Sequence, residues 1–296
     1  MRRRALLSAL PALAVATATP AQQAPLTRRI PSSGETISAI GLGTWITFNV
    51  GRDPPARAQR VQVMQAFFDA GGRVIDSSPM YGSSQGVIGE GMQRLGAQAR
   101  VFAADKVWTS GDGTAQIEAS RAHWQVPRFD LLQVHNLVAW EKQVALLQSM
   151  KAQGQVRYVG ITTSEGRRHD EIERLLKTQR LDFVQFTYNL VDREVEQRLL
   201  PLARDRGVAV LVNRPFQEGA MLRRLQRYPL PAWASEIGCR HWAQVALKFI
   251  VSHPDVTCVI PATSRVDHLQ QNMAAALGSQ PDAAMRRRMA EHVTAL

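Results

Sequence analysis

Eight short apolar runs alternate with amphipathic stretches along most of the chain. The runs that we expect to form strands are 39–43, 73–76, 101–106, 131–135, 158–162, 183–187, 209–213 and 258–261. Helical patterns lie between them, over 57–70, 84–95, 117–124, 141–153, 169–176, 194–206 and 241–252. Strands that are buried on both faces need continuous apolar runs of this kind. The repeat predicts an α/β protein, a (β/α)8 TIM barrel formed by residues 25–296 as a single domain.

The segment before the first strand predicts an additional element. Residues 28–37 form a hairpin pattern that turns at Ser32, Ser33 and Gly34, and this short N-terminal β-hairpin is expected to close the bottom of the barrel. A doubly wound sheet is the rival architecture. It is disfavoured because Gly41-Leu42-Gly43 lacks the third glycine of a dinucleotide-binding turn after a first strand.

The N-terminus predicts export. Arginines at positions 2–4 precede an apolar run of small residues over 5–16, which is too short to span a bilayer. A basic start, an apolar stretch and small residues near 14–18 are typical of a cleavable signal peptide, here residues 1–24. The paired arginines favour the twin-arginine route and a periplasmic or secreted protein, with the export machinery as a partner. The alternative is a disordered basic tail.

Composition excludes several classes of function. The formal charge is +11, but the arginines alternate with acidic residues along the expected helices and indicate solvated faces. No nucleic-acid-binding motif is present, and no run after the signal peptide is long enough for membrane insertion. The histidines lack metal-ligand spacing, so no metal is expected. Cys239 and Cys258 are expected to be buried thiols rather than a disulfide.

Four polar residues follow the expected strands at or just past their C-terminal ends. They are Asp76, Tyr81, Lys106 and His135. The active site of a parallel barrel is built from these strand ends and the loops behind them. A tyrosine, an ammonium, a carboxylate and an imidazole that converge there suit the chemistry of a carbonyl group, because the phenol can supply a proton and the imidazole a hydrogen bond.

The chain resembles the aldo-keto reductase family over nearly all of residues 25–296. The similarity rests on an ordered series of motifs at 41–45, 76–82, 105–107, 132–135, 154–162, 185–189 and 259–263. The interval of five between Asp76 and Tyr81 is a specific part of this series. The resemblance implies NAD(P)H-dependent reduction of aldehydes and ketones.

The four residues take separate roles in that reaction. Tyr81 is expected to act as the general acid and Lys106 to lower the pKa of Tyr81, since a nearby cation favours the phenolate. Asp76 is expected to keep Lys106 charged and oriented. His135 is expected to donate a hydrogen bond to the substrate oxygen.

The resemblance also places a nicotinamide dinucleotide across the barrel mouth. It assigns Thr162, Thr163 and Gln185 to the carboxamide, and it puts Asn213 where an aromatic residue is common. Thr163 lacks the amide found at this position in the family. The remaining expected contacts are Gly43, Thr44, Trp45, Arg214, Pro215, Phe216, Gly219, Thr263, Ser264, Arg265, His268, Gln271 and Asn272.

Cofactor choice and substrate are less constrained. Ala262 and His268 replace the cations that many family members direct at a 2′-phosphate, and Arg265 is the expected substitute because arginine suits phosphate. NADP is favoured over NAD on the resemblance alone. An apolar substrate pocket is expected from four residues in loops after the first four strands, Trp45, Met80, Trp108 and Trp140.

Two other classes of function remain open. A nicotinamide-binding regulatory or sensor subunit would keep the fold without turnover, and the changes at Thr163 and Asn213 are compatible with it. A hydrolase or aldolase barrel is the second. Aldolase chemistry needs a lysine with a depressed pKa, whereas Asp76 is expected to keep Lys106 charged.

Overall fold

Eight parallel strands form the centre of the computed structural model, which describes residues 24–296. In spatial order they are β3 (Leu42–Gly43), β4 (Val74–Asp76), β5 (Phe102–Val107), β6 (Phe129–His135), β7 (Val156–Thr162), β8 (Phe183–Thr187), β9 (Ala209–Asn213) and β10 (Cys258–Val259). The order in space follows the order in the chain. Backbone bonds from Gly41 N to Val259 O (2.8 Å) and from Gly43 N to Pro261 O (3.1 Å) join the first strand region to the last. The (β/α)8 architecture is therefore confirmed.

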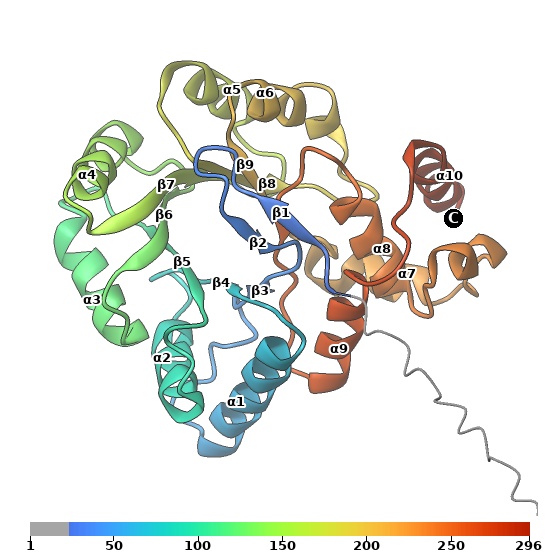
Figure 1. Ribbon diagram of the computed structural model, residues 1–296, viewed down its shortest axis with the longest axis horizontal. Coiled ribbons are helices and arrows are strands. Elements are labelled where there is room, and N and C mark those ends of the chain that lie inside the picture. Colours follow the sequence, from blue (N-terminus) through green and yellow to red (C-terminus); the bar gives the residue numbers. More distant parts are fainter. Residues whose placement is uncertain (1–23) are drawn as a thin grey trace, which may run out of the picture.

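Helices surround the strands as an outer ring (Figure 1). They are α1 (Pro54–Asp69), α2 (Ser84–Leu95), α3 (Thr114–Trp124), α4 (Trp140–Ala152), α5 (His169–Thr178), α6 (Leu199–Asp205), α7 (Ala220–Leu225), α8 (Trp242–Val251), α9 (Val266–Ala274) and α10 (Ala283–Thr294). α1 begins where Asp53 caps the Ala56 N–H and Pro54 occupies the first turn, a position that needs no backbone donor. The seven expected helices match helices of the structure, six of them within three residues at each end.

The sixth expected helix in chain order, over 194–206, was wrong in its extent. The structure has a 3₁₀ turn, η1 (Glu194–Glu196), and then α6 from Leu199. Pro201 accounts for the break, because proline has no N–H and its ring clashes with the carbonyl four residues earlier in a continuous helix. Starting α6 at Leu199 puts Pro201 in the first turn, where that N–H has no intrahelical partner.

The N-terminal hairpin is present and consists of β1 (Thr27–Arg29) and β2 (Thr36–Ser38), paired antiparallel. Gly34 has φ +77°, the left-handed conformation that glycine adopts without strain. Figure 1 shows the hairpin lying across one end of the strand ring. Ile30 and Ile37 are buried there against inward-facing barrel residues, among them Phe102 and Tyr158. The hairpin thus closes the end of the barrel at which the strands begin.

The N-terminal segment that carries the expected signal peptide cannot be compared with the structure. Its residues 1–23 lie outside the described residues. None of the helices formed by residues 24–296 combines the length and the apolar character that a membrane crossing requires. Both cysteines are buried free thiols, as expected.

Candidate active site

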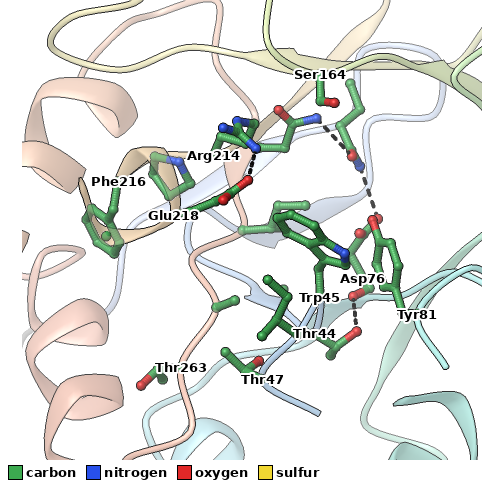
Figure 2. Close-up of a pocket in the computed structure, with 18 of the residues that line it drawn as sticks. Thr44, Trp45, Thr47, Asp76, Tyr81, Ser164, Arg214, Phe216, Glu218 and Thr263 are labelled. Atoms are coloured by element: carbon green, nitrogen blue, oxygen red, sulfur yellow. Dashed lines mark hydrogen bonds and ion pairs between the residues drawn. The ribbon is translucent and has the colours of Figure 1, made fainter. Parts of the chain in front are cut away.

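A cavity of about 610 Å³ opens at the end of the barrel where the strands finish. Three of the four proposed catalytic residues line it, Asp76, Tyr81 and His135, while Lys106 lies behind them and is fully buried. Most of the expected cofactor contacts share this wall: Gly43, Thr44, Trp45, Thr162, Thr163, Gln185, Asn213, Arg214, Pro215, Phe216, Gly219, Thr263, His268, Gln271 and Asn272. Figure 2 shows Asp76 and Tyr81 on one side of the cavity and Arg214 and Glu218 across from them.

Asp76 and Lys106 form a buried ion pair at the ends of adjacent strands β4 and β5. Lys106 Nζ lies 2.5 Å from Asp76 Oδ2 and also donates to Ser77 O at 2.7 Å. The other carboxylate oxygen, Asp76 Oδ1, accepts from Gln185 Nε2 at 3.0 Å and from Gln133 Nε2 at 3.2 Å. Both charges are therefore hydrogen-bonded as well as paired, which is the condition under which a buried ion pair is tolerated.

Lys106 remains charged in this setting. Burial acts to lower the pKa of Lys106, but the carboxylate of Asp76 outweighs it, with a contribution from Tyr81, and the pKa is raised above its usual value. A lysine that attacks a carbonyl must be available as the free amine, which requires the opposite shift. The environment of Lys106 thus disfavours the aldolase alternative.

Tyr81 lies beside this pair, and its pKa departs from the sequence-based expectation. The Lys106 ammonium is 5.1 Å from the centre of the Tyr81 ring and acts to lower the pKa of Tyr81, as expected. Burial of the phenol is the larger effect, and Asp76 adds to it, so the pKa of Tyr81 is raised overall. The expected net lowering of the pKa was wrong because burial of the phenol, together with the carboxylate of Asp76, outweighs the effect of the ammonium. Tyr81 is consequently a protonated phenol at neutral pH.

His135 is a neutral imidazole at the end of β6. The residue is only 6% exposed, and its ring meets the Tyr81 ring edge-on, with centroids 5.8 Å apart. Burial, and then the charge of Lys106, lower the pKa of His135 to about 3. One ring nitrogen, Nδ1, lies 2.9 Å from Ser78 Oγ. A neutral imidazole can donate one hydrogen bond, and this one lies beside the phenol of Tyr81.

A polar network lies beside the ion pair and contains the residues expected to bind a carboxamide. Asn213 Nδ2 donates to Thr163 O at 2.8 Å and to Gln185 Oε1 at 3.3 Å, and Thr162 Oγ1 donates to the same Gln185 oxygen at 3.1 Å. Asn213 therefore fixes the orientation of Gln185 instead of offering a ring face. Sequence reasoning noted the missing aromatic but not this substitute role.

The hydroxyl of Thr163 marks a place where a polar ligand fits. Thr163 lines the cavity and is 2% exposed, yet its Oγ1 has no hydrogen-bond partner within residues 24–296. Buried polar groups are nearly always satisfied, so an unpaired one on a cavity wall favours a bound polar group. A carboxamide supplies both a hydrogen-bond donor and an acceptor. The polar groups on this part of the cavity wall therefore fit the carboxamide of a nicotinamide.

The loop after β9 has an unusual backbone. Arg214, Gln217 and Glu218 all have positive φ values, of 50°, 49° and 56°, and Gly219 has φ +85°. Non-glycine residues in this region cost energy and cluster at functional sites. The Arg214 guanidinium holds the loop by pairing with Glu218 and, at 3.1 Å, with Glu165 in the loop after β7.

Besides Lys106, four of the expected site residues do not line the cavity. Trp108 is 41% exposed in the loop after β5, where both backbone polar groups bind the Gln116 side chain. Trp140 begins α4, and Arg174 stacks on its ring at 5.0 Å. The expected pocket therefore retains only Trp45 and Met80 of its four members.

The expected phosphate contacts Ser264 and Arg265 are the other two. Arg265 forms a bidentate ion pair with Asp267, in which Nε donates to Oδ1 at 3.0 Å and Nη2 donates to Oδ2 at 2.6 Å. Ser264 also lies outside the cavity wall, and its carbonyl oxygen faces Arg60 Nη1 at 3.5 Å. Asp267, two positions along the chain, thus engages the guanidinium that was expected to contact a phosphate.

Sequence reasoning missed Gln133 and Ser78. Gln133 precedes His135 by two positions on β6, so both side chains point to the same face of the strand. A glutamine at that spacing from a candidate catalytic histidine was an available signal. Ser78 gave no such signal, because its contact with His135 joins residues 57 positions apart.

A sequence model of the aldo/keto reductase family matches residues 39–292. The chain belongs to the aldo/keto reductase family. It is 30% identical to methylglyoxal reductase YeaE of Escherichia coli over 259 residues, which cover 83% of this chain and 88% of that protein. The NADH-specific methylglyoxal reductase of the same organism is 25% identical, with 86% and 95% covered.

Solved structures of this family have the same fold. An aldo/keto reductase from Klebsiella pneumoniae, in complex with NADP and acetate, superimposes with a TM-score of 0.75 at 25% sequence identity. The match covers 88% of this chain and 93% of that one. The membership accounts for the order of the motifs and for the cavity at the strand ends.

Proposed function

We propose that this chain reduces small aldehydes and ketones to alcohols with a reduced nicotinamide dinucleotide, and that Tyr81 donates the proton. One observation carries the proposal: a protonated phenol and a neutral imidazole meet on the wall of one cavity, with a buried Lys106–Asp76 pair directly behind the phenol. The two E. coli relatives are named as methylglyoxal reductases, which makes methylglyoxal a rational first substrate.

Four residues of the chain take different roles in carbonyl reduction. When bound, the cofactor supplies the hydride. His135 donates a hydrogen bond to the carbonyl oxygen and thereby aligns it. Tyr81 gives its proton to that oxygen as negative charge develops, and the Lys106 ammonium stabilises the phenolate that remains. Asp76 keeps Lys106 charged between turnovers.

Thr162, Thr163 and Gln185 are the residues that would hold the nicotinamide carboxamide. Their arrangement does not depend on whether the cofactor is NADP or NAD. The Klebsiella structure contains NADP, whereas one E. coli relative is named as NADH-specific. Arg265, which was expected to favour NADP, is engaged by Asp267, so nothing in its environment supports NADP over NAD.

A direct assay tests the proposal. Purified protein is mixed with NADPH or NADH and methylglyoxal, and the loss of absorbance of the reduced nicotinamide is followed. Cofactor binding is measured separately by quenching of tryptophan fluorescence. Binding with turnover supports the reductase. Binding without turnover of any of a panel of aldehydes and ketones would instead establish the sensor role, and absence of both would refute a nicotinamide-dependent function.

We also propose that the protein is exported through a twin-arginine signal. The support is the sequence pattern of residues 1–24. Fractionation of cells that express the full chain, compared with Arg2→Lys, Arg3→Lys and Arg4→Lys combined, tests it. Export of the wild-type chain and cytoplasmic retention of the triple variant are expected. Equal distribution of the two would contradict the proposal.

A further inference from the structure

Ser78 joins the two groups of the site that face a carbonyl. It lies two residues after Asp76 and is fully buried. Its carbonyl oxygen accepts from the Tyr81 N–H at 3.0 Å, and its hydroxyl lies 2.9 Å from His135 Nδ1. The side chain therefore contacts the imidazole, while its backbone anchors the loop that carries the phenol.

The hydrogen bonds of the Ser78 hydroxyl determine where its proton points. Its oxygen accepts from the Met80 N–H at 3.2 Å, and an amide can only donate. Within residues 24–296, the one remaining partner is His135 Nδ1. The hydroxyl proton therefore has a single acceptor available, the lone pair on Nδ1.

The other tautomer of His135, with its proton on Nδ1, leaves the Ser78 hydroxyl without a hydrogen-bond acceptor. If Nδ1 carried the proton, the Ser78 oxygen would accept two N–H bonds and its own proton would have no acceptor. Ser78 is 0% exposed, so water cannot supply one. Leaving a buried donor unpaired costs free energy, so the arrangement that pairs the hydroxyl is favoured. A doubly protonated ring is excluded as well, because the pKa of His135 is lowered to about 3.

We propose that Ser78 is a positioning residue whose hydroxyl donates to His135 Nδ1 and thereby fixes the imidazole in the tautomer with its proton on Nε2. This nitrogen is the one left for the cavity that His135 lines. The tautomer is the one in which His135 can donate to a carbonyl oxygen beside Tyr81. The benefit to catalysis rests on the proposed reductase function, whereas the tautomer itself does not.

Nitrogen NMR of the full chain measures the tautomer directly. Protein labelled with ¹⁵N at histidine gives long-range ¹H–¹⁵N correlations, and the His135 signals are assigned by their loss in His135→Gln. We expect an unprotonated Nδ1 and a protonated Nε2 at neutral pH. A protonated Nδ1 in the wild-type chain overturns the proposal, whatever the variants do.

Two neighbouring serines provide a matched pair of variants. Ser78→Ala removes the donor, and His135 is expected to shift toward signals averaged over both tautomers. Ser77 is equally buried, but its hydroxyl has no hydrogen-bond partner in the described chain, so Ser77→Ala is expected to leave the His135 signals in place. Circular dichroism checks that both variants fold. Identical His135 signals in Ser78→Ala and the wild-type chain overturn the proposal.

Kinetics separate this proposal from the proposed function. In Ser78→Ala, kcat/KM is expected to fall roughly 3- to 10-fold, the scale of one neutral hydrogen bond, while the Kd for the cofactor stays unchanged. An equal weakening of cofactor binding would overturn the positioning role and indicate a structural one. A wild-type chain with the expected tautomer but no reductase activity would support the assignment of Ser78 and refute the reductase function.

Discussion

Two tyrosines occupy opposite ends of the barrel in environments of the same kind. Tyr81, where the strands finish, has the Lys106 ammonium 5.1 Å from its ring centre. Tyr158, where β7 begins, has the Arg157 guanidinium at 5.2 Å. Each also has a carboxylate nearby, and burial raises the pKa of both phenols. Residue types and cation distances do not tell the two apart.

The hydroxyl groups differ. Tyr158 Oη hydrogen-bonds with Glu35 Oε2 at 2.6 Å and with Ser33 Oγ at 2.7 Å, which ties the N-terminal hairpin to the barrel. Tyr81 Oη donates to no residue of 24–296; the Lys106 ammonium lies beside it, and the hydroxyl faces a cavity. Unused hydrogen-bonding capacity beside open space, rather than a charged neighbour alone, marks the phenol that can act on a substrate.

Removal of the two hydroxyls is the strongest test of this contrast. Tyr81→Phe is expected to lower kcat by about 10²–10⁴-fold, the contribution of a general acid, and to leave the free energy of unfolding and the cofactor Kd nearly unchanged. Tyr158→Phe is the control and is expected to keep its kcat. Steady-state rates decide between them, and comparable rates for both variants would contradict the assignment of Tyr81.

The ion pairs behind the two tyrosines are expected to differ in stability. Lys106→Met leaves the buried Asp76 without its cationic partner, which should cost about 3–5 kcal/mol of unfolding free energy. Arg157→Met is the control, because the Arg157 side chain is 31% exposed and water can replace the lost contacts, at a cost of about 1 kcal/mol or less. Urea unfolding measures both. Equal losses of unfolding free energy would mean that burial does not change what the ion pair contributes at either end of the barrel.

The hydroxyl of Tyr158 is expected to have a smaller structural effect. Tyr158→Phe removes a hydrogen bond to the partly exposed Glu35 and should lower the free energy of unfolding by about 1 kcal/mol. Tyr81→Phe, measured by the same urea titration, serves as the reference, because the Tyr81 hydroxyl donates to no residue of 24–296. A larger loss in the Tyr81 variant would reverse the structural roles given to the two residues.

The smallest expected effect is that of pH on the reduction rate. The pKa of His135 is lowered to about 3, so at about pH 5 only about one ring in a hundred is protonated. The pKa of Tyr81 is raised, so the phenol keeps its proton above its usual pKa of about 10. The rate should therefore vary little between about pH 5 and about pH 9. A tenfold change within that window would show that one of these groups titrates there.

The lowered pKa of His135 also makes the stability of the folded chain depend on pH. Its folded-state pKa is lower than its unfolded value, so the unfolded chain binds the proton more readily. The stabilisation from the neutral ring is present above about pH 6.5 and is lost as the pH falls toward about 3. Urea titrations of the wild-type chain and of His135→Gln check this sign, and the variant is expected to lose less stability on acidification.

The barrel and the four central site residues could be predicted from local signals. Apolar runs specify strands, and polar residues at their ends converge because every strand of a parallel barrel points the same way. The ends of α6 were less predictable, since Pro201 moved the start of the helix. The pairing of Arg265 with Asp267 was not predicted, although the two residues stand only two positions apart.

The sequence by itself determined which chemical groups reach the mouth of the barrel, because strand periodicity and parallel order place them. The tertiary structure alone decided what each group does there. In the folded chain Asp76 and Lys106 are buried together, and Ser78 lies beside His135, 57 positions further along the chain. The pKa of Tyr81 is raised although the Lys106 ammonium acts to lower it. Burial, net field and hydrogen-bond partners depend on contacts between distant segments, and no local pattern encodes them.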